Sequence, residues 1–278
     1  MSLDVVTIVL TSVVAGLLGS LTGLGGGMVV IPILTLLGVP LKHAIANSII
    51  AIIATSSGSA SVYVREKLTN IKVAMYLGAF TVIGAIAGAT ITLLVPSKYL
   101  YFLFAALILS SLYGIRREML RGKSYDDTPQ DVFSKWLELE GAYYDENLGK
   151  AVSYRIVRAH LGGPTIMVAG LTAGMLGIGA GAFKVVIQEL ILKMPPKASR
   201  ATSNFIIGMT ALAGSTVYMA SGLVNTVLAG SIAVGATVGS LIGSRLLSKM
   251  NDKTIRALFL VVLLYLFFQM IYKGVISP

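Results

Sequence analysis

The stretch Gly23-Leu24-Gly25-Gly26-Gly27 lies in the middle of a run from Val5 to Leu41 that contains no lysine, arginine, aspartate or glutamate. A second such stretch, Gly177-Ile178-Gly179-Ala180-Gly181, lies in the uncharged run from Leu161 to Phe183. Each glycine costs a helix interior about 0.5–1 kcal/mol relative to alanine, so both clusters predict an interrupted helix. Inside a membrane, interrupted backbone is tolerated only where it faces protein or a water-filled cavity. The two breaks are therefore the first candidates for a functional site.

The composition is that of a membrane protein. Of 278 residues, 55% are hydrophobic and only 12% are charged, and the mean hydropathy is +0.84. Further uncharged runs lie at 73–97, 99–115, 201–244 and 257–272, and a membrane-spanning helix needs about 20 apolar residues. The start Met-Ser-Leu-Asp lacks a basic segment, so we expect no removable signal peptide. We predict an all-α polytopic membrane protein.

Charge and residue types exclude several other classes. The net charge of +10 comes from basic residues that flank the apolar runs, as the positive-inside rule describes, so we expect no nucleic-acid partner. The chain has no cysteine, which excludes thiolate metal sites and disulfides. His43 and His160 have no partner at the spacing of metal ligands. We expect neither metal nor cofactor.

The sequence divides into two similar halves. We expect broken segments with arms at 5–22 and 27–38 and at 161–176 and 182–193. Three further helices follow in each half, at 43–64, 72–95 and 98–115 and at 198–221, 225–247 and 254–273. At an offset of about 154 residues the glycine clusters coincide, and after one inserted residue Pro40 aligns with Pro195. The expected units are a transmembrane repeat at 1–115, a loop at 116–159 and a second repeat at 160–278.

The basic residues indicate how the halves are oriented. If each broken segment enters and leaves the membrane on one side, almost all lysines and arginines fall on the side of the central loop. An odd number of crossings per half then inverts the second repeat relative to the first. Whether the paired arms are re-entrant or each cross fully stays open, because both give the same parity. The loop at 116–159 is therefore expected in the cytoplasm, with a short helix and a β-hairpin around Asp145-Glu146-Asn147-Leu148-Gly149.

A site for a small anion is the chemistry that the breaks favour. Helix N-termini present unpaired N–H groups and about half a positive charge. Lys184 lies three residues after Gly181 and would add a full positive charge. Asn47, Ser48, Thr202 and Ser203 begin the helices after the arms, where they either donate hydrogen bonds to the anion or tie helices together. The candidate substrate-binding residues are Gly23, Gly25, Gly26, Gly27, Asn47, Ser48, Gly177, Gly179, Gly181, Lys184, Thr202 and Ser203.

Glu189 is the only acid within an apolar run. It is either a proton-coupling carboxylate or the partner of Lys193, four residues along the same helix. Both interpretations of Glu189 stay open.

The duplicated glycine clusters, Pro40 and Lys42 before Ala44-Ile45-Ala46-Asn47-Ser48, and the central Leu139-Glu140-Gly141-Ala142-Tyr143-Tyr144-Asp145 together resemble the sulfite exporter TauE/SafE family. The resemblance covers nearly the whole chain. It implies a transporter of sulfite, sulfoacetate or other organosulfonates in the inner membrane of a prokaryote, working mostly by export. The second break has Ala180 where the first has Gly26, which weakens the case for equal roles of the two breaks.

We therefore expect a secondary carrier for a small anion that works by alternating access, in contact with the lipid bilayer. The chain has no phosphate-binding loop pattern, so a substrate or ion gradient would drive it. An anion channel shares these sequence features and is the alternative; an intramembrane enzyme would need a catalytic constellation that the apolar runs lack. The substrate, the coupling ion and whether the protein forms a homo-oligomer stay open.

Overall fold

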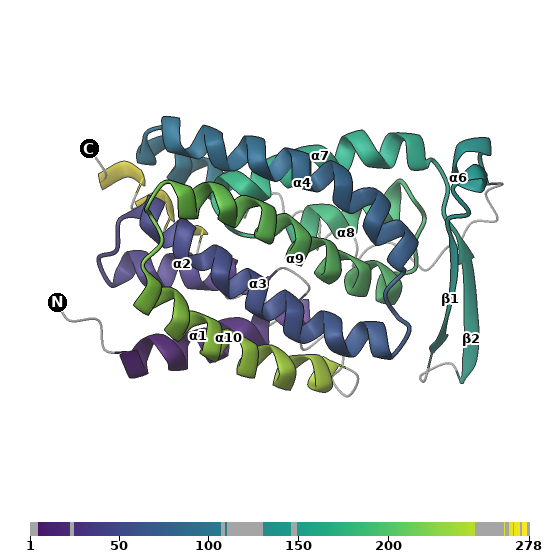
Figure 1. Ribbon diagram of the computed structural model, residues 1–278, viewed down its shortest axis with the longest axis horizontal. Helices are drawn as coiled ribbons and strands as arrows, with labels where there is room; N and C mark the ends of the chain where they lie inside the picture. Colours follow the sequence, from purple (N-terminus) through teal and green to yellow (C-terminus); the bar gives the residue numbers. More distant parts are fainter. Residues whose placement is uncertain are drawn as a thin grey trace.

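The computed structural model describes residues 5–22, 25–106, 109, 130–145 and 149–247, and short pieces between 264 and 276. Long helices run along one axis, and a two-stranded sheet stands across one end of them (Figure 1). Of the described helices, three are long and apolar enough to cross a membrane, at Leu41–Arg65, Ile71–Leu94 and Thr226–Leu246. The described chain is thus mostly helical, as a multi-pass membrane protein requires.

The elements follow one another in the expected order. The first half contains α1 (Val5–Thr22), α2 (Gly27–Leu36), α3 (Leu41–Arg65) and α4 (Ile71–Leu94), and residues 97–106 are also helical. The central part contains α6 (Val132–Trp136), β1 (Glu140–Asp145) and β2 (Lys150–Arg155). The second half contains α7 (Ala159–Leu176), α8 (Gly181–Leu190), α9 (Pro196–Ala220) and α10 (Thr226–Leu247). Most of the helix expected at 254–273 lies outside the described residues.

Matching residues begin matching helices. Pro40 precedes α3 with φ −56° and ψ 143°, and Pro195 precedes α9 with φ −59° and ψ 142°. Proline fixes φ near this value and lacks the N–H that a first turn would leave unpaired. Asn70 caps α4 through a hydrogen bond from the Val73 N–H, and the Asn225 side chain accepts one from the Leu228 N–H at the start of α10. The two halves therefore use the same local devices in the same order.

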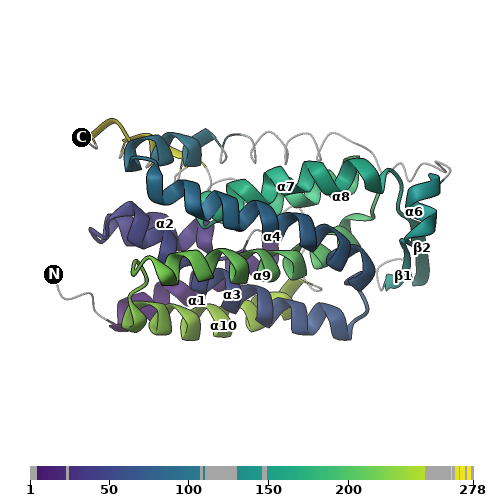
Figure 2. The same ribbon diagram turned by 45° about the horizontal axis from the view of Figure 1, so that its top comes forward.

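The first arm of each half packs along a helix of the other half. α1 lies against α10 and α7 lies against α4, and the turned view preserves both pairs (Figure 2). Glycines make these contacts close: a Cβ at Gly239 would overlap the Val13 carbonyl oxygen, and one at Gly84 would overlap that of Met167. Without a hydrophobic force between helices in lipid, such small residues allow the backbone contact that holds them together. α3 and α9 pack against each other between these outer pairs.

The second arm of each half is short. α2 and α8 have 10 residues each, about 15 Å of helix, half of the hydrocarbon thickness. The Val157 N–H donates to the Leu192 carbonyl, so the chain enters α7 and leaves α8 at the same end of the molecule. In Figure 1, α2 lies toward the opposite end, where the chain also enters α1.

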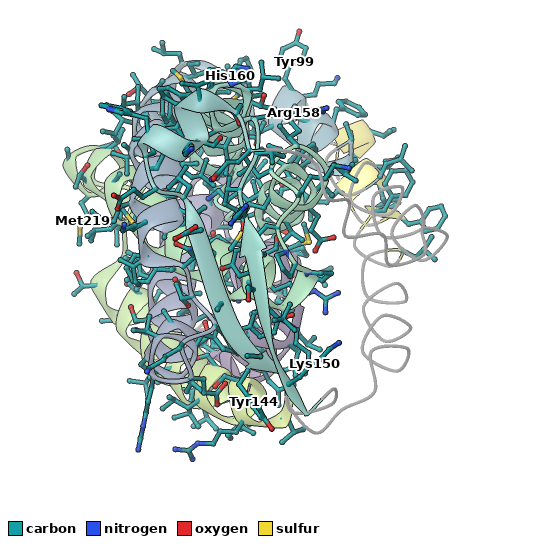
Figure 3. All side chains as sticks on the ribbon, turned by 90° about the vertical axis from the view of Figure 1, so that its right-hand side faces the viewer. Tyr99, Tyr144, Lys150, Arg158, His160 and Met219 are labelled. Carbon is teal, nitrogen blue, oxygen red and sulfur yellow. The ribbon has the colours of Figure 1, made fainter. Side chains whose placement is uncertain are left out.

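The hairpin unit is fastened to one end of the helices. β1 and β2 are antiparallel, with Glu140 opposite Arg155 and Asp145 opposite Lys150. Seen end-on, the strands lie across the helix ends, with Tyr144 and Lys150 far from His160 (Figure 3). The Asn70 side chain donates to the Glu140 carbonyl, and Lys72 forms an ion pair of 2.8 Å with Glu138. Two neighbouring residues at the start of α4 thus hold the unit in place.

Asp131 ties the start of α6 to the start of α7. Its carboxylate accepts hydrogen bonds from the Ser134 hydroxyl and N–H and from the Arg158 N–H. Desolvation opposes ionisation, but these hydrogen bonds outweigh it and lower the pKa of Asp131 to about 2. The carboxylate is therefore ionised throughout the physiological range.

The close contacts of glycine predict which of these residues cannot carry a methyl group. Gly239→Ala forces α1 and α10 apart, and overpacking of this kind costs about 1–3 kcal/mol, or roughly 3–10 °C in Tm. Gly230→Ala is the matched control on the same helix, because a Cβ at Gly230 meets nothing within 4 Å. Thermal denaturation in detergent measures both variants, and equal Tm values for the two would contradict this account of the α1–α10 contact.

Candidate functional site

Both glycine clusters interrupt helices inside the protein. Gly25 has φ +74°, and the second break contains Gly177, Gly179 and Ala180 at φ +59°, +73° and +47°. This left-handed backbone favours glycine, because a Cβ approaches the carbonyl oxygen there. The described residues of both breaks are buried. The sequence prediction of two interrupted helices is confirmed, and Gly23 lies outside the described residues.

The two breaks meet each other. A Cβ at Gly27, the first residue of α2, would overlap the carbonyl oxygen of Gly177, which ends α7. A Cβ at Gly25 would lie 3.3 Å from Ile52 of α3 and 3.4 Å from Ile207 of α9. The breaks of the two halves, more than a hundred residues apart in sequence, thus form one place in the fold.

A small enclosed cavity of about 10 Å³ lies at this place. Among the described residues of its wall, only Thr210 provides a side-chain hydroxyl, and Gly179 brings the second break to it. Its full lining is Ile49, Ile52, Ala173, Gly174, Gly179, Thr210 and Ala211. This volume has room for roughly one water molecule. The structure therefore shows the meeting point of the breaks in a closed form.

Lys184 reaches the same hydroxyl from the first turn of α8. Its side chain is 0% exposed, and its Nζ donates to Thr210 Oγ1 at 2.9 Å. Thr210 Oγ1 in turn lies 3.1 Å from Thr81 Oγ1 of α4. No ion pair recorded for the described residues involves Lys184. A buried ammonium without a counter-ion is costly, and in a membrane protein it points to a functional site.

Three hydroxyls satisfy the carbonyls that the break in α7 leaves open. Ser48 donates to the Gly177 oxygen at 3.0 Å, Thr92 to the Met175 oxygen at 2.7 Å and Tyr218 to the Gly174 oxygen at 2.8 Å. The last carbonyls of any helix lack partners within it, and water is scarce in the membrane interior. In this closed form the Ser48 hydroxyl supports the break.

Asn47 and Thr202 occupy equivalent positions in the two halves. Each side chain holds a turn between two helices, and the two turns lie at opposite ends of the molecule. The Asn225 N–H donates to Asn47 Oδ1, and the Asn70 N–H donates to Thr202 Oγ1, each at 3.0 Å. Asn225 begins α10 and Asn70 begins α4, so each half holds the turn of the other.

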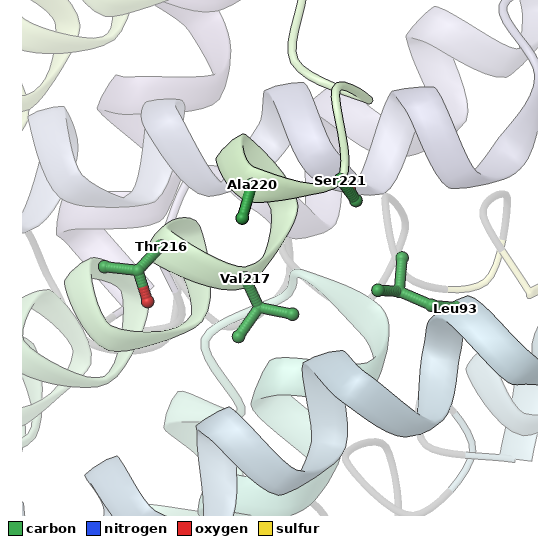
Figure 4. A pocket seen from close by; sticks show the side chains of 5 residues that line it. All are labelled: Leu93, Thr216, Val217, Ala220 and Ser221. Atoms are coloured by element: carbon green, nitrogen blue, oxygen red, sulfur yellow. The ribbon is translucent and has the colours of Figure 1, made fainter.

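An open hollow of about 470 Å³ lies elsewhere, between the ends of α4 and α9 (Figure 4). Its lining is Leu93, Thr216, Val217, Ala220 and Ser221. Thr216 donates to the Ala213 carbonyl and Ser221 to that of Tyr218, both on α9 itself. No charged side chain is among the described residues that line this hollow, so it offers an anion less than the surroundings of Lys184 do.

Comparison with known proteins now identifies the chain. The family model described as "Sulfite exporter TauE/SafE" matches residues 8–270. The chain belongs to the TauE/SafE family. It is a membrane transporter and not an enzyme.

Relatives of this TauE/SafE protein have been named as transporters. The "Probable membrane transporter protein YunE" of Bacillus subtilis is 31% identical, over 98% of this chain and 99% of that protein. The "Probable membrane transporter protein YdhB" of the same organism is 26% identical, over 90% of this chain and 93% of that protein. A further probable membrane transporter, from Methanocaldococcus jannaschii, is 23% identical over 90% of this chain. No solved structure matches the chain at a significant level.

The TauE/SafE fold brings some of the expected site residues together and separates others. Gly25, Gly27, Gly177, Gly179 and Lys184 lie around the meeting point of the breaks, whereas Asn47 and Thr202 fasten turns at opposite ends. Ser203 of α9 lies against the start of α8, with its hydroxyl 3.5 Å from the Gly181 carbonyl oxygen. Glu189 is partly buried in the last turn of α8 and is not without an interaction partner. Its role as a proton-coupling carboxylate stays a prediction.

Sequence reasoning missed Thr210. The position was detectable, because Thr210 follows Ser203 by seven residues and therefore lies on the same face of α9 two turns later. Nothing in the sequence showed that Lys184 would reach it.

The contact between the breaks can be tested by adding one methyl group. Gly27→Ala places a Cβ against the Gly177 oxygen and Ile52, and we expect a Tm lower by roughly 3–10 °C. Gly214→Ala is the control, because that buried position leaves 3.6 Å to the nearest atom, Ile49 Cδ1. Thermal denaturation in detergent measures both variants. A Gly27→Ala variant as stable as the Gly214→Ala variant would contradict the contact between the two breaks.

Proposed function

We propose that this protein is a secondary carrier that exports sulfite or an organosulfonate such as sulfoacetate by alternating access. The anion is held where the glycine breaks meet, against Lys184. The burial of Lys184 beside the enclosed cavity carries this proposal, because a positive charge kept in the protein interior is stabilised by a transient negative ligand.

The groups around Lys184 suit a sulfonate. A lysine ammonium has three N–H donors, and the hydrogen bond recorded for Lys184 among the described residues uses one of them, toward Thr210. The N–H groups in the first turn of α8 and the helix dipole add further positive potential. Glycine at Gly179 and Gly181 lets ligand oxygens approach the backbone. Three oxygens of one sulfonate can therefore be met by a charge, a hydroxyl and backbone amides.

The closed cavity requires a conformational change in any transport cycle. A volume of about 10 Å³ cannot contain a sulfonate, so the breaks must separate to admit one. We assign this movement to two inverted repeats rocking about the meeting point, an arrangement common in transporters. Three features that occur at matching positions of the two halves support it. They are the hydrogen bonds of Asn47 and Thr202 to turns of the other half, the prolines that precede α3 and α9, and the tyrosines Tyr63 and Tyr218. Tyr63 donates to the Ser20 carbonyl of α1 as Tyr218 donates to that of Gly174 in α7.

The proposed orientation places the hairpin unit in the cytoplasm. The ends of α3, α8 and α10 and the starts of α4, α7 and α9 lie at the hairpin end of the molecule in Figure 1. The basic residues in or beside those helix ends are Arg65, Lys67, Lys72, Arg155, Arg158, Lys193, Lys197, Arg200 and Arg245. Lys42 and Lys98 flank helices at the other end. This distribution supports a cytoplasmic hairpin under the positive-inside rule.

Flux through proteoliposomes tests the carrier and the role of Lys184 together. We expect saturable uptake of radiolabelled sulfite or sulfoacetate that accelerates when unlabelled substrate is present on the other side; an anion channel would lack this acceleration. Lys184→Met keeps the length of the side chain and removes the charge. Loss of one charged hydrogen bond costs about 1.5–3 kcal/mol, so we expect uptake to fall roughly 10- to 100-fold.

The matched control is Val30→Met, at the equivalent position of α2. That variant adds the same side chain to the other half and is expected to retain most of the flux. Unchanged uptake by Lys184→Met would remove the lysine from the site, and no uptake by the unmodified protein of any sulfur oxyanion would remove the proposed substrate class.

A further inference from the structure

The two seams between the second arm and the next helix differ in chemistry although they match in position. At the offset between the halves, Lys184 and Gln188 of α8 correspond to Val30 and Leu34 of α2. Ser199 of α9 corresponds to Ala44 of α3. All six side chains are buried. The α8–α9 seam is thus polar at three places where the α2–α3 seam is apolar.

Gln188 is the most unusual member of the polar seam. It is 0% exposed, and neither its Nε2 nor its Oε1 has a hydrogen-bond partner among the described residues. A buried amide left unpaired costs about 1–3 kcal/mol. Leucine at the equivalent position of α2 shows that the fold does not need an amide there. A buried polar group of this kind calls for a partner, such as a ligand or a water molecule.

The serines across the seam are also weakly engaged. Ser199 Oγ lies 3.4 Å from the Val185 carbonyl oxygen, and Ser203 Oγ lies 3.5 Å from that of Gly181. Hydroxyl hydrogen bonds are normally about 2.7–2.8 Å long. Both hydroxyls therefore exchange these contacts for others at little cost when the seam loosens.

We propose that the α8–α9 seam is the passage by which the anion moves between Lys184 and the hairpin end, with Gln188 as its second contact. This inference rests on the proposed function and names the route and a further binding residue. Lys184 and Gln188 are one helical turn apart on the same face of α8, about 6 Å. Beyond Gln188 the chain carries Lys193, Lys197 and Arg200 around the turn into α9, which favours anions at the mouth.

The chemistry of Gln188 suits a transit point. Its Nε2 donates to oxyanion oxygens, and its Oε1 accepts hydrogen bonds from the water that accompanies them. The side chain is neutral and holds an anion less strongly than an ammonium does. Binding that is strong enough to admit an ion and weak enough to release it is what a passage requires. The hydrated oxyanion therefore moves from a charged contact to a neutral one on its way out.

Thiol labelling tests the passage directly, because the chain contains no cysteine of its own. Gln188→Cys and Ser199→Cys are made singly, with Leu34→Cys and Ala44→Cys as matched controls in the other seam. A membrane-impermeant, negatively charged methanethiosulfonate is added to either side of membrane vesicles. We expect the first two variants to react at least tenfold faster than the controls, and from the cytoplasmic side. Equal rates in the two seams, or no reaction at 188 and 199, would overturn the proposal.

Gln188→Leu gives an independent measurement. The substitution installs the residue of the first half and removes the unpaired amide. We expect a Tm equal to or above that of the unmodified protein and an anion uptake at least tenfold lower, whereas a purely structural amide would lower the Tm. Unchanged uptake would remove Gln188 from the route.

The two proposals fail in different ways. If the α8–α9 seam is labelled but the protein transports no sulfur oxyanion, the proposed passage stands and the proposed substrate class is rejected. If uptake depends on Lys184 but the seam does not react, the proposed carrier function stands and the proposed passage is rejected.

Discussion

Backbone groups cannot be left unpaired in the interior of a membrane protein, and this protein ends α7 in its interior. The carbonyls at the end of α7 are met by hydroxyls of Ser48, Thr92 and Tyr218, which come from α3, α4 and α9. Three helices therefore converge on one break because each supplies a donor that the break needs. The same requirement explains why residues distant in sequence surround the meeting point of the breaks in the protein interior.

The two halves share local features, but their chemistry differs. Tyr63 and Tyr218 occupy equivalent positions and contact equivalent carbonyls, yet the distance is 3.4 Å in the first half and 2.8 Å in the second. Ser48 and Ser203 also correspond, and only Ser48 reaches a carbonyl of the opposite half. Lys184 and Gln188 of α8 have apolar counterparts in α2, Val30 and Leu34. Under the proposed function, the first half serves mainly as a packing partner, and the second half holds the groups that bind the ligand.

Much of the fold follows from the sequence, because each long helix is an apolar run with clear ends. α3 was expected at 43–64 and is found at Leu41–Arg65, and α4 was expected at 72–95 and is found at Ile71–Leu94. The breaks were also predictable, since four glycines in five residues do not suit a helix interior. The length of α8 was less well predicted: the helix ends at Leu190, not 193, because the chain turns through Lys193 with φ +57°.

The side-chain partners were not predictable from one half alone. Asn47 and Thr202 look like donors for a ligand in the sequence, but each accepts from a turn of the opposite half. That choice depends on which turn the other half places against them. Thr210 was overlooked because a mid-helix threonine usually bonds to the carbonyl four residues before it, as it does here to Ile206. Only the packing of α8 against α9 shows that the same oxygen also accepts from Lys184.

The asymmetry has a mechanical reason under the proposed cycle. A carrier must present one binding site first to one side of the membrane and then to the other. Two lysines at equivalent positions would repel each other across the meeting point, or would hold two anions at once. A single lysine on α8, with valine at the matched position of α2, leaves one charge that both gates share. The repeated scaffold then supplies two similar ways to open, and the unrepeated lysine ensures that both open onto the same anion.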